Sequence, residues 1–232
     1  MKIRKMSEFE KSVTTKKENN REDAPRASFN IDNCPLRDIP VSQIRPSRLL
    51  LRPLDGARVD ELAKSIGALG QLQPIAVRPV GDGFEVVYGN HRLEACKKLG
   101  LQTIRCYLLE ATSDGQAFLI AEAENIQRND TIDPVAEARG FLTAQKEGFT
   151  QRESGKMVGK TQQYISSRIG LLRLPATILA LITSGLVNPE HGYELSKIRD
   201  DPKKMEFLAD LCRKDRENRF TLKQLRTMTK LS

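Results

Sequence analysis

Histidine and cysteine, the usual ligands of zinc, are few in this chain of 232 residues. Its only two histidines, His91 and His191, are far apart, and its four cysteines include no Cys-x-x-Cys pair. Structural zinc sites need four such ligands, usually in closely spaced pairs. We therefore expect no zinc centre, and we expect Cys96 and Cys106 to be small buried side chains without chemistry of their own.

Long apolar runs are missing as well. No stretch approaches the ~20 consecutive apolar residues that a membrane-spanning helix needs. The first eight residues are charged and lead into no apolar segment, so we expect no secretory signal. These absences predict a cytoplasmic protein that does not enter a membrane.

The charge is uneven along the chain, which has a net charge of +8. Residues 126–232 carry 19 basic and 13 acidic side chains, whereas residues 36–125 carry 11 of each. A basic second half suits attraction to a phosphate backbone, although many solvated surfaces are also mildly basic. The charge makes nucleic acid one expected partner, and it does not by itself distinguish nucleic acid from other partners.

The residue pattern predicts a tail and two domains, an α+β organisation. Residues 1–35 have few spaced apolar positions, so they cannot bury enough surface to order and are expected to be a flexible tail. Residues 36–128 are expected to form a small mixed α/β domain, and residues 129–232 an all-α domain. In the first domain we expect an edge strand at 39–44, strands at 74–80, 84–88 and 103–109, and helices at 58–69, 92–99 and 116–128. In the second we expect helices at 134–148, 151–158, 162–172, 176–183, 189–198 and from 203 onward.

A candidate phosphate site lies where a strand is expected to end at Gly89 and a helix to begin near His91. Such a corner aims free backbone amides at an anion, and Arg92 could add a charge-assisted contact. By itself the corner is weak evidence, because strand-glycine-helix corners occur in many folds. Glu124 and Asn125 end the domain's last helix and offer oxygen ligands suited to Mg²⁺ beside phosphates, with a solvated helix end as the alternative.

A helix-turn-helix is expected over residues 150–172. Thr150 and Glu153 fit a capping box, Gly159 suits the turn, and Thr161 can cap the second helix. Ser154 and Gly155 stand where such motifs usually have an apolar residue and an alanine, so we expect a first helix that is less firmly packed. An ordinary solvated helix in a bundle is the alternative to a DNA-reading one.

The second helix of this motif has an expected core face and an expected DNA face. Helical spacing places Ile165, Ile169 and Leu172 toward the core. It places Gln163, Ser166, Ser167 and Gly170 outward, with Gln162 at the amino end. Gln and Ser side chains can reach base edges in the major groove, and basic side chains can neutralise phosphates. The residues assigned to DNA contact are Lys160, Thr161, Gln162, Gln163, Ser166, Ser167, Arg168 and Arg173.

Together, over roughly residues 36–200, these motifs resemble the ParB family of chromosome and plasmid partition proteins. The run 70–75 is similar to the family's cytidine-side motif, 89–92 to its phosphate motif, and 124–128 to its second phosphate motif. The resemblance implies a ParB/sulfiredoxin-like domain that binds CTP and Mg²⁺, a helical domain that binds a centromere-like palindrome in DNA, a ParA-type ATPase as partner, and a homodimer. The nucleotide-binding residues that it implies are Gly70, Gln71, Leu72, Gln73, Gly89, Asn90, His91, Arg92, Glu124 and Asn125, with Glu124 and Asn125 also beside the metal.

The chain departs from the family pattern at two places. Asn90 and His91 replace a Glu and an Arg, so at most a weak CTPase is expected and no catalytic residue is assigned. Only a basic helical segment, residues 203–230, follows the DNA-binding region, where relatives usually have a dimerisation domain. Two alternatives stay open. One is a DNA-binding regulator without nucleotide turnover, and the other is a nucleotide-dependent small-molecule kinase or sulfiredoxin-like enzyme, whose related turn also ends in His-Arg.

Overall fold

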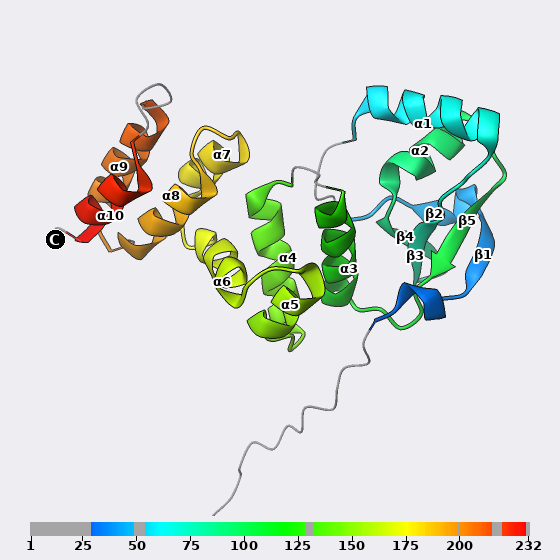
Figure 1. The fold of residues 1–232 in the computed structure, drawn as a ribbon, viewed down its shortest axis with the longest axis horizontal. Coiled ribbons are helices and arrows are strands. Elements are labelled where there is room, and N and C mark those ends of the chain that lie inside the picture. The colour runs from blue at the N-terminus through cyan, green and yellow to red at the C-terminus, as the bar shows by residue number, and fades with distance from the viewer. Residues whose placement is uncertain (1–28, 49–53, 129–131, 199, 215–219, 231–232) are drawn as a thin grey trace, which may run out of the picture. The chain divides into compact units, whose positions relative to one another are not determined.

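The fold is described from a computed structural model over residues 29–48, 54–128, 132–198, 200–214 and 220–230 (Figure 1). The expected flexible tail falls mainly on residues 1–28, outside the described ones. Its described end contains a short 3-10 helix, Ile31–Asn33. A mixed five-stranded sheet with its helices is followed by a helical region, which confirms the α+β class. The predicted boundary at 128/129 adjoins residues 129–131, which are not described.

The sheet has the strand order β1-β5-β3-β4-β2. The pairs β1/β5 and β3/β4 are antiparallel, and the pairs β3/β5 and β2/β4 are parallel. The expected strands at 74–80 and 84–88 are confirmed as β3 and β4, which form a hairpin because they are joined by a short turn and pair along their length. The strands are β1 (Leu36–Pro40), β2 (Ile44–Arg45), β3 (Ile75–Val80), β4 (Gly83–Tyr88) and β5 (Thr103–Leu108).

The single edge strand expected at 39–44 is wrong. The chain pairs with β5 as far as Pro40, turns through a 3-10 helix (Val41–Gln43), and then pairs with β4 at the opposite edge of the sheet. Pro40 has no N–H with which to extend the ladder. The amide of Val41 is satisfied instead by the carbonyl oxygen of Gln102, at 3.0 Å. Two short edge strands therefore replace one.

Two helices complete the amino-terminal core. Helix α1 (Gly56–Leu69) begins at Asp55, whose carboxylate accepts a hydrogen bond from the amide of Ala57, and it packs against α2 (Asn90–Lys98). Cys96 and Cys106 are fully buried in this core, as expected. Other members of the core are Ile39, Val41, Ile44, Ile66, Ile75, Val77, Val86, Leu93 and Ile104.

Helix α3 (Asp114–Gln127) joins the sheet to the helical region. It contacts β4 on one side and α4 (Pro134–Lys146) and α5 (Gln151–Val158) on the other. Its Phe118 ring meets Phe141 of α4 edge to face, with the ring centroids 5.1 Å apart. A Cβ atom at Gly140 would stand 2.1 Å from the Phe118 ring, so only glycine permits this approach of α3 to α4.

The helical region continues with short helices around a second core. Most of the predicted helices are confirmed within one or two residues, although residues 196–198 are 3-10 rather than α-helical. None of the described helices has the length and apolar character needed to cross a bilayer. The remaining helices are α6 (Gln162–Leu171), α7 (Ala176–Thr183), α8 (Pro189–Leu195), the 3-10 helix Ser196–Ile198, α9 (Pro202–Lys214) and α10 (Leu222–Lys230).

Candidate functional site

The predicted phosphate corner is built on a glycine that no other residue can replace without strain. Gly89 has φ 102° and ψ 25°, the left-handed region, and precedes the first turn of α2. A Cβ atom there would lie 2.7 Å from the side chain of Ile75 on β3. Because the first amides of a helix have no intrahelical acceptor, the corner presents N–H groups at its opening. The predicted backbone geometry is confirmed.

Asn90 and His91 both brace the corner from within. The side-chain oxygen of Asn90 accepts a hydrogen bond from the amide of Ser47 at 3.0 Å. The Nε2 atom of His91 accepts one from the amide of Asp55 at 3.1 Å. An accepting Nε2 carries no proton, so this bond needs the neutral ring with its proton on Nδ1. The two residues that depart from the family motif thus tie the corner to the chain on either side of residues 49–53.

Arg92 brings the three predicted nucleotide segments together. Its buried guanidinium donates to the carbonyl oxygen of Pro74 at 2.7 Å and to the side-chain oxygen of Gln73 at 2.9 Å. Its Nη2 atom also lies 3.9 Å from a carboxylate oxygen of Glu124. Burial lowers the pKa of Arg92, and the charge of Glu124 acts in the opposite direction. A permanent positive charge is thereby held inside the corner.

In the loop expected to border a base, the side chains of Gln71 and Gln73 form hydrogen bonds, and Leu72 is an exposed apolar residue. Gly70 ends α1 at φ 73°, and Leu72 is 72% exposed. The amide group of Gln71 exchanges two hydrogen bonds with the backbone of Arg105, at 2.7 and 2.9 Å. Gln71 thus extends the sheet edge beside β5, whereas Gln73 holds Arg92.

The proposed metal ligands were expected at the carboxyl end of α3. Glu124 forms an ion pair with Arg128 at 2.6 Å, besides its approach to Arg92, and Asn125 is buried. Across the described residues, no three His, Cys, Asp or Glu side chains gather as a metal cluster. Mg²⁺ is commonly held by one or two protein oxygens together with phosphates. The residues therefore fit an ion shared with a triphosphate and do not fit a closed protein cage.

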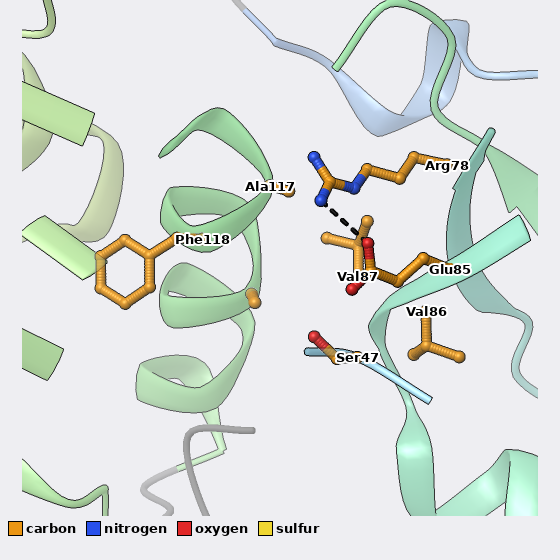
Figure 2. A pocket seen from close by; sticks show the side chains of 8 residues that line it. Ser47, Arg78, Glu85, Val86, Val87, Ala117 and Phe118 are labelled. Atoms are coloured by element: carbon orange, nitrogen blue, oxygen red, sulfur yellow. Dashed lines mark hydrogen bonds and ion pairs between the residues drawn. The ribbon is translucent and has the colours of Figure 1, made fainter. Parts of the chain in front are cut away.

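A buried ion cluster beside this corner fixes α3 to the sheet. Arg78 of β3 donates to Glu85 of β4 at 2.9 Å and also pairs with Asp114 at the start of α3. Burial acts to raise the pKa of Glu85, but hydrogen bonds from Arg48 and Arg78 outweigh it and hold that pKa below its usual value. Figure 2 shows Arg78 and Glu85 facing each other across from α3. The adjoining cavity, about 10 Å³, is water-sized and too small for a nucleotide.

The helix-turn-helix begins and turns as predicted. Thr150 and Glu153 form the reciprocal capping box, with Glu153 accepting from the Thr150 amide at 2.6 Å. Gly159 ends α5 at φ 68°, and the Thr161 hydroxyl accepts from the Tyr164 amide at 3.1 Å. The hydroxyl of Thr161 therefore serves the start of α6. Because this oxygen already accepts a hydrogen bond within the helix, Thr161 is less available to contact DNA.

The expectation of a loosely packed first helix is wrong. A Cβ atom at Gly155 would stand 2.6 Å from the carbonyl oxygen of Lys160, so the missing side chain lets α5 approach the turn closely. Ser154 is also buried. Gly155, which stands where such motifs usually have an alanine, therefore brings α5 closer to the turn.

The exposed side of α6 is narrower than its helical spacing predicts. Gln162 and Gln163 are exposed and Ile165 is buried, as expected, while Ser166 and Ser167 are half-buried. Gly170 was expected to face outward, and this is wrong. It is buried, because a Cβ atom there would be 2.9 Å from the ring of Tyr193 on α8.

Two of the three predicted phosphate-neutralising residues face solvent. Lys160 and Arg173 are exposed. Arg168 is instead only 18% exposed and pairs through its Nε atom with Glu137 of α4 at 2.7 Å. Its guanidinium carbon lies 4.6 Å from the centre of the Tyr164 ring. Arg168, which the sequence assigned to DNA contact, is thus held against Glu137, because the buried carboxylate of Glu137 requires a positive partner.

Glu137, Glu122 and Tyr164 were not recognised from the sequence. Glu137 shares a helical stripe with the buried Phe141 and Ala144, and Glu122 shares one with Phe118. A carboxylate on an apolar stripe is the signal that could have identified both. Tyr164 also lines a groove of about 260 Å³ between α6, α8 and α10. Its other lining residues include Gln163, Ser167, Tyr193 and Arg226.

Comparison with known proteins accounts for both halves of this arrangement. Residues 26–126 match the model of the ParB N-terminal domain, and residues 130–230 match that of the ParB HTH domain. The chain belongs to the ParB family. It is 37% identical over 158 residues to the chromosome-partitioning protein Spo0J of Thermus thermophilus, covering 68% of this chain and 58% of that protein. It is 31% identical over 182 residues to a nucleoid occlusion protein of a Geobacillus species, covering 77% of this chain and 64% of that protein.

Two solved ParB structures share the fold. One is the C-terminally truncated chromosome-partitioning ParB of Caulobacter crescentus complexed to the centromeric parS site, with a TM-score of 0.59 and 21% identity. It covers 84% of this chain and 100% of that one. The other is a Pnob8-like ParB-N domain, with a TM-score of 0.52 and 14% identity over 84% of this chain and 98% of that one. The present chain spans about three fifths of the length of the two curated ParB relatives above.

Proposed function

We propose that this chain is a ParB-type partition protein that recognises a palindromic, centromere-like DNA site through α6. The observation that carries the proposal is the amino end of α6, where Gln162 and Gln163 are exposed beside the exposed Lys160. Glutamine amides can read adenine edges in the major groove, and lysine can neutralise phosphates. Family membership, and the parS complex of the Caulobacter relative, support the same assignment.

The DNA-contacting set is revised by the positions of the side chains. We assign base contact to Gln162 and Gln163, and phosphate contact to Lys160 and Arg173, all of which are exposed. Half-buried Ser166 and Ser167 lie at the margin of this surface. Arg168 is assigned a positioning role, because its guanidinium is held by Glu137.

A binding titration with duplex DNA tests this assignment. A duplex carrying a parS site and a scrambled duplex of the same composition are compared by fluorescence anisotropy at several salt concentrations. Lys160→Ala should weaken binding to both duplexes and flatten the salt slope, by about 0.9 for each lost phosphate contact. Gln163→Ala should reduce the preference for parS. Lys64→Ala, an exposed lysine on α1, is the control and should change neither. Unchanged binding in both Lys160→Ala and Gln163→Ala would show that another element reads the DNA.

We also propose that CTP binds with its phosphates against the Gly89 corner. The support is the convergence of Gln73 and Glu124 on Arg92, next to the first backbone amides of α2. A buried guanidinium and a helix amino end both favour phosphate oxygens. Mg²⁺ would neutralise phosphate charge, with Glu124 and Asn125 as its protein-side neighbours. We propose no hydrolytic step, since Asn90 and His91 are engaged in bracing the corner.

Calorimetric titration with CTP, ATP and buffer, each with Mg²⁺ and with or without the parS duplex, tests the nucleotide proposal. Wild-type protein should bind CTP in preference to ATP, and Arg92→Ala should abolish the heat of binding. Lys97→Ala is the matched control, because it removes a positive charge from the opposite end of α2. If neither nucleotide binds under any of these conditions, the nucleotide proposal fails, and the protein is a DNA-binding protein that is not gated by nucleotide.

The cellular role and partners are proposed from family membership. A ParA-type ATPase and a second copy of the chain are the expected partners, at the nucleoid or on a plasmid. Relatives named as nucleoid occlusion proteins make control of division beside the nucleoid the second candidate role. Deletion of the gene separates the two. A higher rate of chromosome or plasmid loss supports partition, whereas septa placed across the nucleoid without such loss support the second role.

A further inference from the structure

Arg226 of α10 lines the same groove as the exposed end of α6. Helix α6 packs against α8, α8 packs against α10, and the groove of about 260 Å³ lies between these three helices. Gln163 and Ser167 line it from α6, and Leu222 and Arg226 line it from α10. Gln163, the proposed base-reading residue, therefore shares an opening with a cation from a helix outside the helix-turn-helix.

A buried carboxylate holds Arg226 in place. The Nε atom of Arg226 donates to Glu194 of α8 at 2.9 Å, and Glu194 is only 3% exposed. The Arg226 side chain is itself 55% exposed, and its two Nη atoms make no hydrogen bond to any described residue. One of the five N–H groups of the guanidinium thus fixes the side chain, and the other four remain available to an anion.

Glu194 also holds a second cation, Lys197. The ammonium of Lys197 donates to the other carboxylate oxygen at 2.7 Å and lies 4.7 Å from the centre of the Tyr193 ring, which also lines the groove. Burial acts to raise the pKa of Glu194, but the hydrogen bonds from Lys197 and Arg226 prevail and keep that pKa below its ordinary value. Glu194 is therefore ionised at neutral pH. Two cations share one carboxylate, so the cluster has a net positive charge.

The surrounding charges favour an anion on the α10 side of the groove. Helix α10 contains three basic side chains and no acidic one, and Lys223 is exposed one turn before Arg226. Among the residues that line the groove, the acidic ones are Glu194 and Glu190. Glu190 is exposed to water and lies one turn before Glu194 on α8, so it opposes an anion at that end of α8 rather than beside α10.

We propose that Arg226 and Lys197, both held by Glu194, form a phosphate site for DNA outside the helix-turn-helix. The proposal rests on the proposed entry of α6 into the major groove. That groove is about 12 Å wide and has a sugar-phosphate strand along each side. A duplex whose bases meet Gln163 therefore places a phosphate strand beside α6, and Arg226 borders the same opening. Arginine and lysine are the usual partners of such phosphates, and their contacts carry no sequence information.

Salt-dependent DNA binding of Arg226→Gln and Lys197→Gln tests the site. Each lost phosphate contact should lower the salt slope by about 0.9 and weaken binding on the order of fivefold at about 0.1 M salt. The loss should be equal on the parS duplex and the scrambled duplex. Arg213→Gln, which removes an exposed arginine from α9, is the matched control and should change neither slope nor affinity. An unchanged slope in either variant would remove that residue from the site, and an unchanged slope in both would overturn it.

Urea denaturation of the same variants separates phosphate contact from a purely structural role. Glu194 keeps one of its two cations in each variant, so both proteins should fold. A lower unfolding midpoint and weaker binding, with the wild-type salt slope, would show that the ion pairs serve only the fold, and the proposal would fail. Should Arg226→Gln not fold, Lys197→Gln carries the test with the same expectation, because its side chain is 49% exposed.

Comparison with the α6 variants distinguishes failure of the phosphate site from failure of the proposed function. If Lys160→Ala and Gln163→Ala alter DNA binding while Arg226→Gln and Lys197→Gln keep the wild-type slope, the role of α6 stands and the phosphate site fails. If only Arg226→Gln and Lys197→Gln flatten the slope, the phosphate site stands and the reading of DNA by α6 fails. If the wild-type protein binds neither duplex, both fail.

Discussion

The Arg92 guanidinium donates a hydrogen bond to the side-chain oxygen of Gln73 at 2.9 Å, linking helix α2 to the loop that precedes β3. Residues 19 positions apart in the chain thereby meet at the corner where Gly89 turns the chain. The same guanidinium satisfies the Pro74 carbonyl and faces Glu124. The arginine proposed to bind phosphate thus also holds the corner together.

Arg92→Ala should therefore reduce stability as well as nucleotide binding. Loss of the guanidinium leaves the partly buried Pro74 carbonyl without this donor, which costs about 1–3 kcal/mol. Urea denaturation of the nucleotide-free protein measures the change. Arg92→Lys cannot reproduce both hydrogen bonds and should recover only part of the loss. Wild-type stability in Arg92→Ala would contradict the structural role of the residue.

Gly155→Ala should destabilise the helix-turn-helix. The added Cβ atom would collide with the backbone carbonyl of Lys160, and such overpacking costs roughly 1–3 kcal/mol. Gly56→Ala, at the open start of α1, is the control because its Cβ atom would meet no neighbour within 4 Å. Comparison of their unfolding midpoints tests the close approach of α5 to the turn. Equal midpoints would mean that the backbone at Lys160 shifts to accept the added Cβ atom without loss of stability.

Arg168→Ala should lower the stability of the fold, whereas Lys160→Ala should lower the affinity for DNA. Removing Arg168 leaves Glu137 without its positive partner, which destabilises the fold by about 3–5 kcal/mol. Lys160 is exposed, so its loss should leave the unfolding midpoint nearly unchanged and act on DNA affinity alone. Denaturation and salt-dependent DNA binding of both variants separate the roles. A wild-type midpoint in Arg168→Ala, with a flattened salt slope, would restore Arg168 as a phosphate contact.

The buried thiols should resist modification in the folded protein. Burial raises the pKa of Cys106 to about 12 and also raises that of Cys96, so neither forms thiolate at about pH 8. Titration with a thiol reagent should leave both unmodified until denaturant is added. Cys34 and Cys212 are half-buried and provide the internal comparison. Rapid labelling of Cys106 in the native state would contradict its place in the core.

Local signals predicted much of this structure, and tertiary contacts account for what they missed. The limits of α5 follow from its capping box and Gly159, which act within a few residues of the helix ends. The inward face of Gly170 could not be read from its helix alone, because it depends on Tyr193 of α8.

The same limit applies to the charged residues. Arg168 was assigned to DNA contact, and its ion pair with Glu137 could not be foreseen, because Glu137 lies on a helix 31 positions earlier in the chain. Similarly, the family motifs named Gln73, Arg92 and Glu124 as members of one site. Only the fold shows that Arg92 meets both of the others.

Sequencing of the DNA recovered with the protein from cells tests most directly whether α6 reads a defined site. The account predicts that wild-type protein is recovered with a few discrete loci sharing a palindrome, and that Gln163→Ala loses this enrichment while Lys64→Ala keeps it. Recovery of DNA spread evenly over the genome, or an unchanged set of loci in Gln163→Ala, would contradict it.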